Sequence, residues 1–176
     1  MKIYNNIILV GGTGRNVGKT TFVCKLINKF KDQNVIGLKI CPYMHDIERA
    51  ENLLLSDENF QILRETNMDG KKDSSKMLMN GAKEVYYIQA VDEGILTAFN
   101  FLMEKFIGNH PVICESASLR KYIQPDINFC VTSNDENLEN KKSCDFNFDC
   151  IVTNERNDFD FNFDRLELVE NKWVLS

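Results

Sequence analysis

Several features that define other protein classes are missing from this sequence. No apolar run approaches the ~18 residues that a membrane-spanning helix requires, and Met1-Lys2 leads into a short strand-like run instead of the apolar core of a signal peptide. The six cysteines show no Cys-x-x-Cys spacing, so we interpret them as ordinary buried, reduced thiols and not as metal ligands. We therefore expect a cytoplasmic protein without a membrane partner.

Basic residues are also fewer than acidic residues. The chain has 21 lysines and arginines against 26 aspartates and glutamates, a net charge of −5. Nucleic acids and anionic lipid surfaces select basic protein surfaces. The composition therefore argues against a nucleic-acid partner.

The features that are present describe one globular domain. The chain has 176 residues, of which 43% are hydrophobic and 27% charged, which is enough for one sizeable core. We find no internal repeat and no linker. The prediction is a single domain over residues 1–176.

Strand-like and helix-like segments alternate along the chain. Short apolar runs predict strands at 3–10, 35–40, 84–90, 111–114, 127–131 and 148–153, and a hairpin at 166–175. Helical spacing predicts helices at 20–31, 74–80 and 94–106. Residues 41–57 are expected to form a loop with one helical turn around 48–55, residues 58–65 a short helix, and residues 133–147 a polar loop. This alternation favours an α/β fold with a mainly parallel sheet covered by helices on both faces.

A glycine-rich segment follows the first predicted strand. Gly18-Lys19-Thr20 ends the pattern of a phosphate-binding loop, although the first glycine of the strict pattern falls on Thr13. Glycines let backbone N–H groups turn toward phosphate oxygens, and the next helix offers its uncapped first turn. Lys19 can then reach the β- and γ-phosphates, and the Thr20 hydroxyl can ligate Mg²⁺. The alternative is a glycine-rich turn with a solvated lysine.

The loop predicts a P-loop NTPase fold that binds GTP or ATP with Mg²⁺. At its tip, contact with phosphate and simple solvation are equally open for Arg15 and Asn16. The residues expected to bind the nucleotide are Gly12, Thr13, Gly14, Arg15, Asn16, Val17, Gly18, Lys19, Thr20, Thr21 and, from a later strand, Asn154.

Three residues outside the loop are candidates because they follow predicted strands, where ligands bind on parallel sheets. Lys39 ends the second strand and is expected to point toward the nucleotide crevice, or else to extend into solvent. Glu115 ends the fourth strand and is expected to hold Mg²⁺ or orient water, or else to cap the next turn. Asp46 either approaches the metal or bonds to its own loop. We expect catalytic roles for Lys19, Lys39 and Glu115, and metal contacts from Thr20, Glu115 and Asp46.

Three further polar segments have more than one possible role. Asp73 and Ser74 either cap the helix that begins there or contact a substrate. Candidates for reading the nucleobase are Thr153-Asn154 and the segment 133–135. No Asn-Lys-x-Asp segment is present, so the sequence leaves guanine and adenine both open.

The order of several segments resembles a known family. Val-Ile-Gly-Leu-Lys-Ile at 35–40, His45-Asp46, Lys-Asp-Ser-Ser-Lys-Met at 72–77 and Gly-Ala-Lys-Glu-Val at 81–85 are similar to segments of the molybdopterin-guanine dinucleotide biosynthesis adapter proteins, the MobB family. The similarity covers roughly residues 7 to 115. Cys41 departs from it, since the family has histidine after the strand lysine. The phosphate loop itself is more similar to that of dethiobiotin synthetase.

The resemblance implies a SIMIBI-class P-loop protein that binds GTP, hydrolyses it slowly and serves a molybdenum-cofactor biosynthesis enzyme as partner. The alternatives are an ATP-dependent synthetase, as the loop suggests, and a regulator that binds nucleotide without chemistry.

Aromatic and polar residues alternate at 158–164, which predicts a half-buried strand. Phe159, Phe161 and Phe163 would then share one face. That face either packs on the sheet edge or forms an interface with a second copy, and we expect a homodimer.

Overall fold

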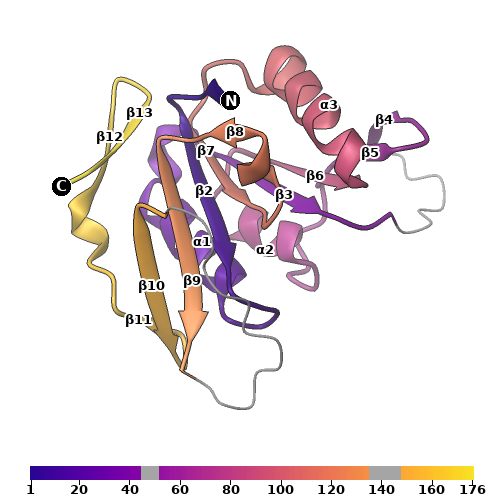
Figure 1. Ribbon diagram of the computed structural model, residues 1–176. Coiled ribbons are helices and arrows are strands. Elements are labelled where there is room, and N and C mark those ends of the chain that lie inside the picture. The colour runs from indigo at the N-terminus through magenta and orange to yellow at the C-terminus, as the bar shows by residue number, and fades with distance from the viewer. Residues whose placement is uncertain (45–51, 135–147) are drawn as a thin grey trace.

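The computed structural model describes residues 1–44, 52–134 and 148–176. A nine-stranded sheet forms its centre, with the order β11-β10-β9-β2-β7-β3-β6-β5-β4 (Figure 1). Its strands in chain order are β2 (Ile7–Gly12), β3 (Ile36–Cys41), β4 (Leu53–Ser56), β5 (Phe60–Arg64), β6 (Glu84–Ala90), β7 (Val112–Glu115), β9 (Ile127–Ser133), β10 (Cys150–Glu155) and β11 (Asp158–Phe159). A short parallel pair joins β1 (Lys2–Ile3) to β8 (Ile123–Gln124).

The middle of this sheet is parallel and its margins are antiparallel. Strands β10, β9, β2, β7, β3 and β6 are parallel neighbours, whereas β11, β5 and β4 pair in the antiparallel sense. The α/β class with a mainly parallel sheet is therefore confirmed, and the antiparallel margins make the sheet mixed. Residues Ile7–Val10 are entirely buried, as the short apolar run of a central parallel strand requires.

Helices cover both faces of the sheet. Helix α1 (Lys19–Lys29) and helix α2 (Asp73–Met79) pack on one face, and helix α3 (Asp92–Leu102) packs on the other. Successive strand residues point to opposite faces, so Ile8 and Val10 face α1 while Ile7 and Leu9 face α3. A π-helical turn at Met103–Ile107 extends α3, and 3-10 turns occur at Lys31–Gln33, Leu119–Lys121 and Phe163–Arg165. None of the helices among the described residues is long and apolar enough to cross a membrane.

The short helix expected at 58–65 is wrong. Residues 53–56 and 60–64 form the antiparallel hairpin β4–β5, whose second strand pairs with β6. Phe60 and Ile62 are buried on the face that α3 covers, so this segment follows the two-residue period of a strand. Asp57 closes the turn, because its side chain accepts the Asn59 N–H at 2.6 Å. The helical turn expected at 48–55 is likewise wrong for residues 53–55, and residues 45–51 lie outside the described part of the chain.

The C-terminal part packs back onto α1. Only Asp158–Phe159 of the segment 158–164 is a strand, so the half-buried strand expected there is wrong beyond β11. The rings of Phe159, Phe161 and Phe163 lie 5.2 to 5.7 Å from the Phe22 ring of α1. These aromatic side chains are therefore covered within the chain, and the expectation of a homodimer stays untested.

The hairpin expected at 166–175 is confirmed. Strands β12 (Leu166–Val169) and β13 (Lys172–Leu175) pair in the antiparallel sense around Glu170 and Asn171, which have positive φ of 50° and 62°. Two positive φ values are the mark of the tightest hairpin turns. The Trp173 indole fixes the hairpin to the body of the protein, since its Nε1–H donates to the Asn6 carbonyl at 3.1 Å.

Candidate functional site

The glycine-rich loop connects the end of β2 to the start of α1. Figure 1 shows β2, β9 and β10 reaching the same end of the sheet, so the loop lies at the carboxyl ends of the parallel strands. Gly18 precedes α1 in a left-handed conformation with φ of 100°, no side chain caps the helix, and its first turn has no acidic residue. The first N–H groups of α1 therefore lack side-chain acceptors, which is the arrangement that binds anions at a helix start.

Lys19 folds back over this loop. Its ammonium donates to the Gly14 carbonyl at 2.5 Å. Burial lowers the pKa of Lys19 below its usual value, and the Glu115 carboxylate partly opposes that change. A Cβ on Gly12 would lie 2.9 Å from the Lys19 side chain and 2.7 Å from the Val131 carbonyl oxygen. The absence of a side chain at Gly12 therefore leaves room for the Lys19 side chain.

The other residues of the loop differ in exposure. Thr13 and Val17 are buried, and the Thr13 N–H donates to the Val131 carbonyl at 3.1 Å. Arg15 and Asn16 at the tip are exposed. The two tip side chains therefore extend into solvent, and the expectation that the loop contacts phosphate stays untested.

Thr20, Lys39 and Glu115 meet at the start of α1. The Thr20 hydroxyl donates to Glu115 Oε2 at 2.9 Å, and the Lys39 ammonium donates to Glu115 Oε1 at 2.5 Å. Lys39 and Glu115 are directly opposite each other on the neighbouring strands β3 and β7, on the face that α1 covers. The Glu115 side chain is only 3% exposed, so its charge depends on these two donors.

Asp73 extends this cluster toward α2. Its carboxylate contacts the Lys39 ammonium at 3.1 Å and the Lys76 ammonium at 3.5 Å. Burial alone would raise the pKa of Asp73, but the Lys39 and Lys76 charges outweigh it and hold the pKa below its usual value. For Lys39, burial would lower the pKa, but Glu115 and Asp73 raise it above its usual value.

Neither Asp73 nor Ser74 caps helix α2. The helix starts from Lys72, whose N–H donates to the Ser75 hydroxyl at 3.1 Å, while the Ser74 hydroxyl donates to Glu65 at 2.6 Å. The capping alternative is therefore wrong, because Ser75 has that role. Asp73 instead faces the cluster around Glu115.

The residues present fit a magnesium ion that arrives with a triphosphate. Among the residues described, no group of three or more His, Cys, Asp and Glu side chains could hold a metal by itself. Mg²⁺ bound with a nucleotide needs only one or two protein oxygens, because phosphates and water complete its six ligands. The Thr20 hydroxyl and the buried Glu115 carboxylate supply such oxygens. Asp46, the third expected metal ligand, lies outside the described residues.

Asn154 secures the glycine-rich loop. This residue of β10 is 8% exposed. Its amide nitrogen donates to the Val17 carbonyl at 3.0 Å, and its amide oxygen accepts the Asn157 N–H at 2.8 Å. Both ends of the amide are therefore engaged within the protein, and the expectation that Asn154 contacts the nucleotide stays untested. No local sequence pattern indicates this contact, which joins residues 137 positions apart.

The other residues expected near a nucleobase are also engaged. The Asn134 amide donates to Glu155 at 2.9 Å, the Thr153 N–H donates to the Asp160 carboxylate at 2.5 Å, and Ser133 is buried. Asp135 lies outside the described residues. These contacts leave the choice between guanine and adenine as open as the sequence does.

Arg120 lies close to the loop and was missed by sequence reasoning. A Cβ on Gly11 would lie 3.6 Å from its Nη1, and its guanidinium lies over the Phe148 ring at 4.8 Å. No local pattern marks this arginine, because its position depends on how the 3-10 turn at Leu119–Lys121 follows β7.

The contacts around Glu115 and the uncapped start of α1 are the chemical features of this site. No protein-family model matches the chain, and comparisons with curated proteins and with solved structures return no match.

Proposed function

We propose that this protein binds a nucleoside triphosphate with Mg²⁺ at Gly11–Thr21 and acts as a GTP-binding adapter that hydrolyses the nucleotide slowly. The observation that carries the proposal is the convergence of Thr20, Lys39 and Glu115 beside the uncapped start of α1. The supposed place in molybdenum-cofactor biosynthesis, with an enzyme of that pathway as partner, rests on the segment order at 35–85 alone.

Each residue of the site has a distinct task in this proposal. The loop N–H groups and the first turn of α1 bind phosphate oxygens. The Lys19 ammonium leaves the Gly14 carbonyl and pairs with the terminal phosphates. Their negative charges stabilise the ammonium far better than one neutral carbonyl does. Thr20 and Glu115 orient Mg²⁺, which when bound neutralises phosphate charge. Lys39 supplies a second positive charge to the site.

The engagement of Glu115 supports slow hydrolysis. Both of its oxygens accept hydrogen bonds, one from Thr20 and one from Lys39. A carboxylate held in this way by an ammonium is a poor acceptor for a proton from attacking water. We therefore assign Glu115 to the metal and not to water activation.

An ATP-dependent synthetase is the second candidate. Two lysines, Lys19 and Lys39, flank the expected position of the terminal phosphate, and both could stabilise charge during phosphoryl transfer. This alternative requires a second substrate next to the loop.

Thermal melting tests the proposal. Purified protein would be heated with Mg²⁺ and matched concentrations of GTP, ATP, GDP or ADP. A ligand present at 100 times its Kd stabilises the native state by about 2.7 kcal/mol. A large shift with GTP alone supports the adapter, and a preference for ATP supports the synthetase.

Two variants complete this experiment. Lys19→Ala should melt like the wild type without ligand and lose the nucleotide shift, whereas Lys31→Ala, an exposed lysine beyond the far end of α1, should keep it. Absence of a shift with all four nucleotides would overturn the proposal.

A further inference from the structure

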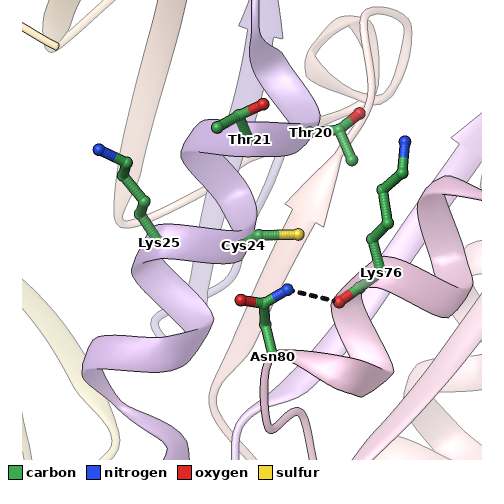
Figure 2. A pocket seen from close by; sticks show the side chains of 6 residues that line it. All are labelled: Thr20, Thr21, Cys24, Lys25, Lys76 and Asn80. Carbon is green, nitrogen blue, oxygen red and sulfur yellow. Dashed lines mark hydrogen bonds between the residues drawn. The ribbon is translucent and has the colours of Figure 1, made fainter. Parts of the chain in front are cut away.

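A groove separates α1 from α2 next to the start of α1. It has a volume of about 290 Å³ and is lined by Thr20, Thr21, Cys24, Lys25, Lys76 and Asn80 (Figure 2). This volume is at the lower end of the range for small-molecule sites. None of the described residues that line it is acidic, and two are lysines.

The two ends of the groove differ chemically. Figure 2 shows the Thr20 and Thr21 hydroxyls and the Lys76 ammonium at the end near the loop. Cys24 and Asn80 lie at the other end. The Asn80 amide nitrogen donates to the Lys76 carbonyl at 2.8 Å, so its amide oxygen, which is directed toward α1 in Figure 2, is the acceptor that faces the groove. One end thus offers donors and positive charge, and the other end offers an acceptor.

Lys76 is the cation available to a ligand in this groove. Its side chain is 46% exposed, and its contact with Asp73 is long at 3.5 Å, because Asp73 lies closer to Lys39. The Lys25 ammonium instead lies over the Phe159 ring at 5.2 Å and points away from Lys76 in Figure 2. Lys25 therefore contributes its aliphatic stem to the wall, and Lys76 contributes charge.

We propose that this groove binds a second, small ligand that has a carboxylate or phosphate group at one end and a hydroxyl or amine donor at the other. The anionic group pairs with Lys76 and accepts from the Thr21 hydroxyl, because the Thr20 hydroxyl already donates to Glu115. The donor end bonds to the Asn80 amide oxygen. Ligand binding in the groove stands by itself, whereas its role as the site of a second substrate rests on the synthetase alternative under the proposed function, since Thr20 lines the groove and also belongs to the nucleotide site.

The matched probes for this site are glycerol 3-phosphate, n-propyl phosphate and glycerol. The first has the anion and the hydroxyl donors, the second has only the anion, and the third has only the hydroxyls. Binding would be followed by NMR of isotope-labelled protein at constant ionic strength, through the backbone resonances of Thr21, Cys24 and Asn80. We expect glycerol 3-phosphate to bind more tightly than n-propyl phosphate, and glycerol not to bind.

Three variants locate the binding. Lys76→Gln should weaken glycerol 3-phosphate about tenfold, because it removes a charge-assisted bond. Lys71→Gln, the same change at a lysine that is 84% exposed beside Asp69, should leave the affinity unchanged. Asn80→Leu should remove the difference between glycerol 3-phosphate and n-propyl phosphate.

All titrations are repeated in Lys19→Ala protein, so that anion binding by the loop is separated from binding in the groove. Groove resonances that shift in both proteins and depend on Lys76 support the inference, even if no nucleotide binds. Shifts confined to residues 13–18 that vanish with Lys19→Ala would overturn it and favour the proposed function. Equal weakening by Lys76→Gln and Lys71→Gln would also overturn it.

Discussion

Glu115 is the carboxylate on which the polar contacts of the site converge. It lies at the end of a buried strand, is 3% exposed, and accepts from both Thr20 and Lys39. Removing the charge of such a carboxylate leaves the Lys39 ammonium without its neutralising partner. The resulting loss of stability is larger than the net stabilisation that the ion pair provides. The residue therefore links the stability of the site to its proposed metal chemistry.

Glu115→Gln should lower the free energy of unfolding by about 2 kcal/mol, because the amide still accepts from one donor but no longer neutralises Lys39. It should also remove the Mg²⁺ dependence of nucleotide binding. Urea denaturation measures the first effect and melting with and without Mg²⁺ the second. Glu104→Gln is the matched control, since Glu104 in the Lys105–Glu104 pair is 73% exposed and its change should cost less than about 1 kcal/mol. Equal costs for the two variants would contradict the role of Glu115.

Asp73 makes the stability of the folded protein depend on pH. Its pKa is held below the usual value of 3.8 in the folded state. A depressed carboxyl pKa contributes stability that is present above the unfolded value and is lost as the pH falls through the folded value. Asp73→Asn should therefore be less stable than the wild type near neutral pH, and the difference should shrink below about pH 4.

Urea denaturation at a series of pH values measures this dependence. Asp32→Asn, the same change in the exposed 3-10 turn after α1, serves as the control and should show no such convergence. A constant difference between Asp73→Asn and the wild type at every pH would contradict the pairing with Lys39.

At the scale of elements, strand β10 supports the glycine-rich loop through Asn154. Asn154 donates to the Val17 carbonyl, and a Cβ on Gly18 would lie 2.3 Å from the Asn154 amide nitrogen. Gly18 also has φ of 100°, where L side chains are strained. The glycine is therefore required both by its backbone conformation and by the close approach of Asn154.

Gly18→Ala should lower the free energy of unfolding by about 2 to 4 kcal/mol, from backbone strain and overpacking together. Adding Asn154→Gly should recover the part that is due to the clash, while the strain remains. Gly108→Ala is the control, since Gly108 has φ of 57° and open space around it, so Asn154→Gly should not relieve its cost. Chemical denaturation of the wild type, the three single variants and the two double variants gives these differences, and additive effects of Gly18→Ala and Asn154→Gly would contradict the contact.

Several helices and strands could be predicted from local sequence pattern. The segments that became β2, α1, β6 and the C-terminal hairpin have periods or turn residues that act within a few neighbours, and their prediction is confirmed. Residues 58–65 were misread because a short apolar run has no decisive period. Pairing with β6 decided in favour of a strand, since it buries Phe60 and Ile62.

At the scale of the whole molecule, the C-terminal hairpin closes the α1 face of the sheet. Trp173 is 2% exposed and packs on Phe30 with ring centroids 4.9 Å apart. Its backbone N–H donates to the Asp126 carboxylate at 3.0 Å. The hairpin is therefore joined both to Phe30 near the start of the chain and to Asp126 in its later half.

Trp173→Ala should lower the free energy of unfolding by about 3 to 5 kcal/mol and keep a single cooperative transition, as one domain over residues 1–176 requires. Val174→Ala, on the same strand but 40% exposed, should cost less than about 1 kcal/mol. Fluorescence and circular dichroism followed through urea denaturation measure both. Two separate transitions in the wild type would contradict a single domain.

The sequence alone determined the glycine-rich loop, the strand before it and the helix after it, because these depend on glycine conformations, apolar runs and helical spacing over a few residues. It also indicated Lys39 and Glu115 as candidates, since both end apolar strands. Only the tertiary structure decided that Glu115 contacts Thr20, 95 positions away in the chain. It also decided that Asn154 holds the loop and that α2 packs beside α1 to form a groove. Such contacts are decided by sheet order and strand register, which depend on the burial of the whole chain.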